Sequence, residues 1–213
     1  MKYVIVDERG IDCGGTICKE WNSLQDYKES VMNCRSGYYA GHIRVFLLFM
    51  ESELLDDIQL AASVQGKTAQ KLAREQGKPV SEFGMFQEIG ESDYWKWSKR
   101  VIGVAMSEAE SVLYSIAKHR TTGPRSKDDQ REKQVEYALE LRVPNTFSDT
   151  SMMAILRYVH DFIVARVLWE WANLTYVPFA EFWLSKMDLD KQNMVKEALR
   201  GSTGEARLAE GWV

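Results

Sequence analysis

Residues 152–174 read MMAILRYVHDFIVARVLWEWANL and form the most apolar long segment of the chain. Only four charged residues interrupt this segment, at spacings of four or five: Arg157, Asp161, Arg166 and Glu170. This spacing leaves one narrow polar line along a predicted helix, and a helix that is apolar on its other sides is buried on several of them. Ser148 or Asp149 can cap its start. The segment therefore predicts the central helix of a multi-helix domain.

Helical periodicity continues over most of the remaining chain. The helix predicted to follow Asp128 or Asp129 should stop before Val143, because a residue that precedes proline is pushed out of the α region. The other predicted helices cover 21–33, 38–65, 68–76, 81–89, 93–119, a short one from Pro178, and a last one capped by Asp188 that ends at Gly201.

The N-terminal residues have a different pattern. KYVIV at 2–6 is β-branched and aromatic, and turn signals follow in DERG and in the Gly14-Gly15 pair, which predicts a β-hairpin. The predicted fold class is mainly α, a multi-helix bundle-like domain with a small N-terminal β-hairpin. Residues 1–19 would form the hairpin packed on the main domain, 20–200 the helical domain, and 201–213 a flexible C-terminal tail.

Composition limits the compartment and the class of partner. The chain has 213 residues, 45% hydrophobic and 27% charged, with a net charge of −4. These are globular values, and the net charge argues against a general nucleic-acid coat. The N-terminus carries charges where a signal peptide needs an apolar centre, and no apolar run is long enough to span a bilayer. Three cysteines cannot form a complete disulfide framework. We therefore expect a cytoplasmic protein with no membrane partner.

Two residue sets have ligand or catalytic types. Cys13, Cys18, Cys34 and His42 are a weak zinc candidate, because the first two cysteines are widely spaced and unpaired cysteines commonly serve as small apolar residues. His160-Asp161, with His119, Asp188 and Asp190, has the residue types of a metal-dependent hydrolase. However, neighbouring residues of a helix point about 100° apart, and no catalytic motif accompanies the doublet. We expect no metal, no cofactor and no enzymatic activity.

Basic residues gather in the middle of the chain. DYWKWSKR at 93–100 opens a predicted helix in which Tyr94 and Trp97 belong to an apolar stripe, so these two rings should face the core. Cations near a helix start are unfavourable by about 0.3–1 kcal/mol each, which hints at an anionic partner. Residues 118–133 add six basic residues against three acidic ones. The candidate phosphate-contacting residues are Lys96, Lys99, Arg100, Lys118, Arg120, Arg125, Lys127 and Arg131.

Aromatic residues gather in the last third of the chain. Trp169, Trp171, Phe179, Phe182 and Trp183 are residue types enriched at interface hot spots, although one large monomer core would use them as well. The sequence predicts a non-enzymatic interaction protein that binds a macromolecular partner through an apolar and aromatic surface and that self-associates as a dimer or higher oligomer. The alternative is a nucleic-acid-associated protein or nucleoprotein subunit that contacts phosphates through residues 96–133.

Overall fold

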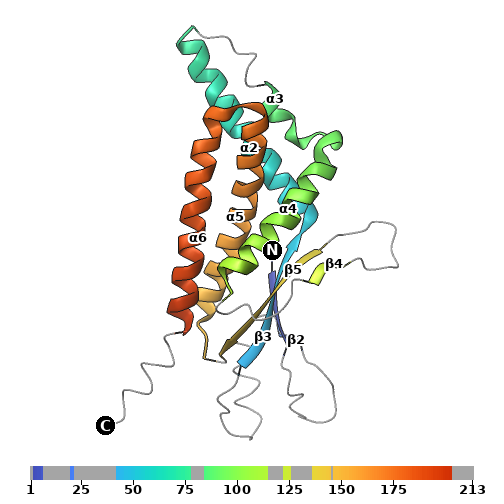
Figure 1. Ribbon diagram of the computed structural model, residues 1–213, viewed down its shortest axis with the longest axis vertical. Helices are drawn as coiled ribbons and strands as arrows, with labels where there is room; N and C mark the ends of the chain where they lie inside the picture. The colour runs from blue at the N-terminus through green and yellow to red at the C-terminus, as the bar shows by residue number, and fades with distance from the viewer. Residues whose placement is uncertain are drawn as a thin grey trace, which may run out of the picture.

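The computed structural model describes residues 2–6, 20–21, 42–77, 84–114, 122–125, 136–144 and 146–202. Four long helices pack together beside a sheet, and α5 and α6 lie side by side along the long axis (Figure 1). The long helices are α2 (Glu51–Glu75), α4 (Ser92–Val112), α5 (Asp149–Thr175) and α6 (Ala180–Ser202). The prediction of a mainly helical fold with β structure at the N-terminal side is confirmed.

The sheet has five antiparallel strands in the order β2-β1-β3-β5-β4. They are β1 (Lys2–Val6), β2 (Glu20–Trp21), β3 (His42–Met50), β4 (Thr122–Arg125) and β5 (Glu136–Pro144). β1 pairs with β2 as the predicted hairpin requires, but the second strand begins at residue 20, just beyond the predicted boundary. The hairpin is thus the edge of a larger sheet.

The helix predicted over 38–65 is wrong in its first part, where the structure has strand β3. Ile43, Val45, Leu47 and Phe49 are fully buried, and the residues between them are only partly buried. This alternation is the period of a strand with one face in the core. The same run also contains apolar residues at spacings of three and four, so the sequence pattern fits both structures.

The helix predicted to end before Val143 is also wrong, because residues 136–144 form β5. Tyr137, Leu139, Leu141 and Val143 are buried on one face of this strand. β5 pairs with β3 along its whole length, with Val45 opposite Leu141 and Leu47 opposite Leu139. The residues of β5 include the helix formers Ala, Leu and Glu, and pairing with β3 overrides that local preference.

Helix α2 continues further along the chain than predicted and joins parts of two predicted helices into one. It continues through Gly66 and Thr68 as far as Glu75, where Gly77 follows with a φ of 67°. Gly66 is buried, and a Cβ at this position would collide with the side chain of Gln87. This glycine therefore allows the close approach of the short helices α3 (Gly84–Gln87) and η2 (Glu88–Gly90).

Helix α5 is the central helix, as its sequence predicts. Its start is capped by Ser148, whose side chain accepts a hydrogen bond from the backbone N–H of Ser151 at 3.4 Å. Its apolar residues belong to one core shared with α2, α4, α6 and the inner face of the sheet. The polar line is also present, and Arg166 on it contacts Glu108 of α4 at 3.0 Å and Glu170 at 2.6 Å.

The end of the chain differs from prediction in one respect. Pro178 lies in a single 3-10 turn, η3 (Val177–Phe179), after which α6 runs unbroken through Asp188, so this residue caps no helix. The tail predicted from residue 201 lies outside the described residues from 203 onward. Within the described ranges, no helix has both the length and the apolar character needed to cross a bilayer.

Candidate functional site

An apolar groove runs between α2 and α6 and is the candidate functional site. One wall is the face of α2 from Asp57 to Leu72, and the other is formed by Phe179 of η3 with Phe182 and Trp183 of α6. The groove has a volume of about 550 Å³. Among the described residues that line it, Asp57 alone is charged, so the groove has an acidic end and an apolar length. We call it the α2–α6 groove.

The walls of the groove are held in place from inside. The indole Nε1 of Trp183 donates a hydrogen bond to Oε1 of Gln65 at 2.6 Å, which links α6 directly to α2. Phe179 packs edge-on against Phe86, with 4.9 Å between the ring centroids. Because both rings are anchored, the groove is a preformed feature of the fold.

Its rim carries apolar side chains that remain largely in solvent. Leu60, Val64 and Phe182 have 62%, 57% and 56% of their surface exposed. Large apolar residues that are exposed singly are ordinary, but several around one hollow form the kind of patch that marks a contact site. The groove can therefore bury apolar surface of a partner.

The acidic end of the groove adjoins a buried histidine. His160 of α5 lies with Nε2 3.1 Å from Oδ2 of Asp57 and with Nδ1 3.5 Å from Oδ1 of Asp161. His160 is buried, stacks on Phe49 and does not line the groove, whereas half of the Asp57 side chain is exposed. The neighbouring imidazole lowers the pKa of Asp161 against the opposing effect of partial burial.

A lysine of α6 completes this charge cluster. Lys186 Nζ lies 3.2 Å from Oδ2 of Asp190 and 3.8 Å from Oδ2 of Asp161. Burial raises the pKa of Asp190, and Lys186 acts in the opposite direction. His160, Asp161 and Asp190, which the sequence placed in one weak catalytic set, are therefore neighbours in space. Their contacts link α2 to α5 and α5 to α6 and so help to hold the three helices together.

The five predicted interface aromatics divide between core and surface. Trp171 is buried, and its Nε1 donates to the backbone oxygen of Phe86 at 2.9 Å, so it offers no contact surface. Trp169 is partly buried beneath the guanidinium of Arg166, which lies 4.8 Å from the ring centroid. Phe179, Phe182 and Trp183 meet at the α2–α6 groove, where only Phe182 is strongly exposed.

The predicted basic residues are also divided. Tyr94 and Trp97 face inward as predicted, at 4.8 and 5.3 Å from the ring centroid of Trp171. Lys99 Nζ is 2.6 Å from Oε1 of Glu51, and the other oxygen of this carboxylate, Oε2, accepts a hydrogen bond from the Tyr137 hydroxyl at 3.2 Å. Lys99 is thus already paired within the domain.

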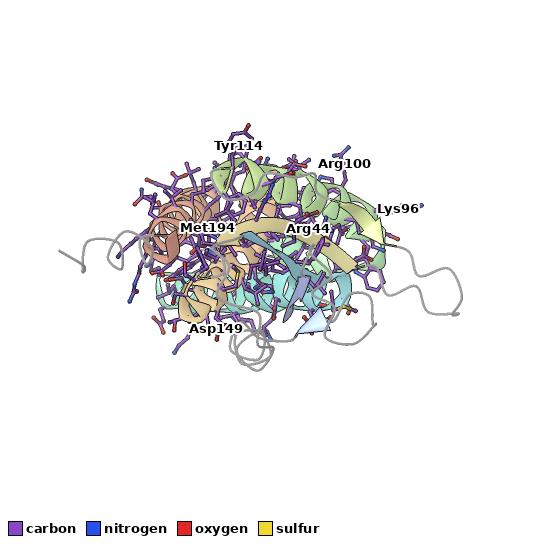
Figure 2. All side chains as sticks on the ribbon, turned by 90° about the horizontal axis from the view of Figure 1, so that it is seen from below. Arg44, Lys96, Arg100, Tyr114, Asp149 and Met194 are labelled. Atoms are coloured by element: carbon purple, nitrogen blue, oxygen red, sulfur yellow. The ribbon has the colours of Figure 1, made fainter. Side chains whose placement is uncertain are left out.

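Lys96 and Arg100 point away from the domain on the outer side of α4, where Tyr114 also projects (Figure 2). Neither cation has an ion-pair partner within the described part of the chain. Arg125 belongs to β4, whose side chains are not described. The other predicted phosphate contacts lie outside the described residues: Lys118, Arg120, Lys127 and Arg131.

The weak zinc candidate cannot be assembled from the described residues. Cys13, Cys18 and Cys34 lie outside them, and His42 is placed only as the first residue of β3. Among the residues with described side chains, no three His, Cys, Asp or Glu are grouped as metal ligands would be. The absence of a metal stays a prediction.

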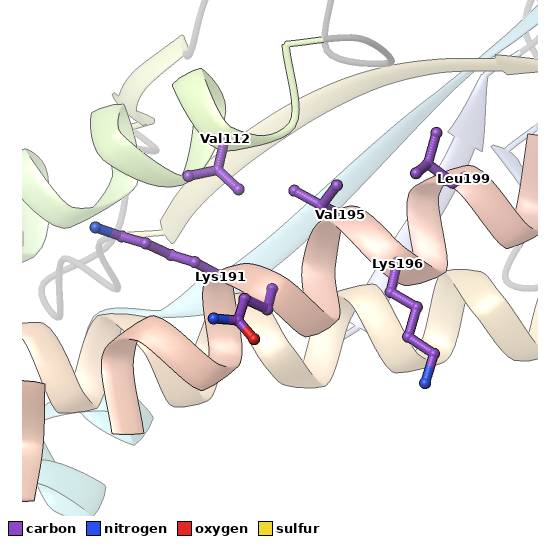
Figure 3. A pocket seen from close by; sticks show the side chains of 6 residues that line it. Val112, Lys191, Val195, Lys196 and Leu199 are labelled. Carbon is purple, nitrogen blue, oxygen red and sulfur yellow. The ribbon is translucent and has the colours of Figure 1, made fainter. Parts of the chain in front are cut away.

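A second groove lies between the end of α4 and α6 and has a volume of about 660 Å³. Val112 of α4 faces Val195 of α6 across it, whereas the side chains of Lys191 and Lys196 diverge (Figure 3). Lys191 Nζ lies 5.4 Å from the ring centroid of Phe162. Because the two ammonium groups do not converge, this groove is no anion site.

Sequence reasoning missed the α2 wall of the candidate site, including Leu60, Val64 and Leu72. These apolar residues lie among polar ones in the segment that follows strand β3, and this pattern was the available signal of an exposed apolar face. The predicted helix began at residue 38, whereas α2 begins at Glu51. The outer face of α2 can be assigned only from the correct helix start. No family model, curated protein or solved structure matches the chain.

Proposed function

We propose that the protein is a helical interaction protein, not an enzyme, which binds a macromolecular partner through the α2–α6 groove. The observation that supports this function is the set of large exposed apolar side chains, Leu60, Val64 and Phe182, around a hollow with anchored walls. Apolar surface that is removed from water contributes about 25 cal/mol per Å² before the costs of association are subtracted. Leu60, Val64 and Leu72, the strongly exposed large apolar residues of α2, all line the groove.

The dimensions of the groove favour an amphipathic helix as the bound element. The α2 wall from Asp57 to Leu72 spans four turns, or about 23 Å at 1.5 Å per residue. A partner helix would lay apolar residues at i, i+3, i+4 and i+7 along such a length. Trp183, which is fixed by Gln65, would form the floor, and Phe182 would close over one side.

A photo-crosslinking experiment tests this function. Benzoylphenylalanine replaces Phe182 in the full chain, and, in a separate variant, Tyr114, which lies just beyond the end of α4. Tyr114 is the more exposed of the two, at 75% against 56%, so simple exposure favours adducts at residue 114. We expect a protein adduct at residue 182 that survives nuclease treatment and that residue 114 does not form.

A matched pair of substitutions provides the control. Val64 lines the groove and Val104 lies on α4, and both are exposed valines in helices. Val64→Arg should abolish the adduct at residue 182, whereas Val104→Arg should retain it. Equal adducts in both variants, or an adduct only at residue 114, would remove the groove as the binding surface.

Nucleic-acid association is the second candidate function, and one observation favours it. Lys96 and Arg100 lie one turn apart on the outer side of α4, are exposed, and have no ion-pair partner among the described residues. Trp95, which is 45% exposed, directly precedes Lys96 in the sequence. Such a surface would contact phosphates without reading bases. Its binding would weaken steeply as salt rises, whereas an apolar groove would respond little.

A further inference from the structure

Seven exposed residues form a stripe along the outer side of α2, at alternating spacings of four and three. This is the spacing of a seam between two paired helices. In chain order the stripe consists of Glu53, Asp57, Leu60, Val64, Lys67, Lys71 and Arg74. Two acids come first, two apolar residues follow, and three bases come last. We call it the α2 stripe.

The two halves of the stripe carry opposite charges, with acids before its middle and bases after it. If a second α2 lies antiparallel to the first, with Val64 opposite Val64, then Asp57 faces Lys71 and Glu53 faces Arg74. Leu60 then faces the aliphatic stem of Lys67. A parallel arrangement would instead place acid opposite acid and base opposite base. The stripe is therefore complementary to a second copy of itself in one orientation.

Favourable interaction with the helix dipole explains only the charged residues at the two ends of the stripe. Acids near the start and bases near the end of a helix are favourable, but the effect is confined to the first and last turn. Glu53 lies in the first turn of α2 and Arg74 in the last. Asp57 lies further inside and contacts His160, whereas Lys67 and Lys71 also lie further inside and have no ion-pair partner among the described residues, so no contact within the described part of the domain accounts for these two cations.

We propose that the occupant of the α2–α6 groove is a second copy of this chain, docked through its own α2 in antiparallel orientation. This proposal rests on the proposed function of the groove and names its partner. A two-fold axis passes near Val64, so each contact occurs twice. Leu60 and Val64 belong both to the stripe and to the groove rim, and Phe182 stands beside them.

The two kinds of contact have separate tasks. Exposed ion pairs contribute little individually, so the apolar centre provides the affinity and the charges select the antiparallel orientation. Asp57 keeps half of its side chain in solvent although Oδ2 contacts His160. It can therefore accept a cation from the second copy without leaving the first partner.

The test compares charge reversals by sedimentation equilibrium over a wide concentration range. The chain has a mass of 24.5 kDa, and we expect the wild type to approach twice this mass. Lys67→Glu/Lys71→Glu should weaken the dimer at least tenfold. Lys96→Glu/Arg100→Glu, which makes the same charge change on exposed α4 positions, should not affect it.

A mixing experiment identifies the orientation. Glu53→Lys/Asp57→Lys gives a basic stripe that should also fail to pair with itself. An equimolar mixture of the basic variant with Lys67→Glu/Lys71→Glu should form a heterodimer in native mass spectrometry. If loss of the Asp57–His160 contact unfolds the basic variant, which thermal melting would report, the acidic variant and its α4 control decide alone.

Two results overturn the proposal. One is a wild type that stays monomeric at every concentration, and the other is a dimer to which the acidic variant is indifferent. Either result leaves the proposed function standing if residue 182 still crosslinks to a different protein in a manner that Val64→Arg abolishes. Loss of that adduct as well would remove both.

Discussion

Helices α4 and α2 are attached to the central helix α5 in two different ways. α4 is held by aromatic rings, with Tyr94 and Trp97 packed on Trp171. α2 is held at its acidic end by a polar contact between Asp57 and His160. Both attachments include a charged contact, since Arg166 of α5 also pairs with Glu108 of α4, but only the attachment of α4 adds packed aromatic rings.

The outer faces of the same two helices also differ. Along the outer side of α2 the acids come first, the apolar residues follow and the bases come last. The outer side of α4 carries Lys96, Arg100 and Val104, without a matching run of acids, and Tyr114 follows just beyond its end. A face that is complementary to itself favours self-association, whereas an unbalanced cationic face favours an anionic partner.

The largest expected effect comes from breaking the aromatic attachment. Trp171→Ala removes a buried ring on which two others pack and leaves the Phe86 carbonyl without its donor, at a cost of about 3–5 kcal/mol. Trp95→Ala is the control, because this ring is 45% exposed; its loss should cost about 1 kcal/mol, mainly for its hydrogen bond to Gly90. Urea unfolding measures both, and equal losses would contradict the ring attachment.

A smaller effect is expected from protonation of Asp161, the carboxyl group next to the imidazole of His160. The pKa of Asp161 is lowered in the folded state, so the folded state binds this proton less tightly than the unfolded chain. The stability that Asp161 contributes is complete above about pH 4 and is lost as pH falls through the lowered pKa. Asp161→Asn should therefore reduce the loss of stability in acid.

Asp190 should have the opposite slope. Burial raises its pKa, so its contribution is present below about pH 4 and is lost as pH rises through the raised pKa. Asp190→Asn should remove that loss and leave the acid limb unchanged. Urea unfolding from pH 2.5 to 6 compares both variants with the wild type. Identical curves for all three chains would refute the assignment of the two carboxyl groups.

The smallest effects are expected on the outer side of α4. Lys96→Gln/Arg100→Gln should change the free energy of unfolding by no more than about 0.5 kcal/mol, because neither side chain is paired within the described residues. Lys99→Gln loses the pair with Glu51 and should cost up to about 1 kcal/mol. If the protein binds nucleic acid, the double variant should weaken binding and lower its salt slope by about two.

Several features of the fold could be predicted from the sequence because they depend on local spacing. The burial of α5 on several sides, the Ser148 cap and the inward rings of Tyr94 and Trp97 are of this kind. Strands β3 and β5 could not be predicted in this way. Their residues fit the helical period as well as the strand period, and each strand exists by pairing with the other.

The candidate site was predictable only on one side. Phe179, Phe182 and Trp183 stand out in the sequence by their residue types. Their counterparts on α2, such as Leu60 and Val64, are common residue types in a helix. The prediction also placed the start of this helix at residue 38, whereas it begins at Glu51. The proximity of Asp57 to His160 joins residues about a hundred positions apart, and no local pattern encodes it.

Because side-chain periodicity is a local property, the order of residues alone establishes which faces of α4 and α5 are apolar and how the charges follow one another along α2. The tertiary structure decided that residues 42–50 and 136–144 are strands, that α2 continues past Gly66, and that α2 and α6 enclose a groove. A strand needs another strand to pair with, and a groove needs two walls, and in both cases the second element lies far away in the sequence. The energy of that contact selects between local conformations of similar stability.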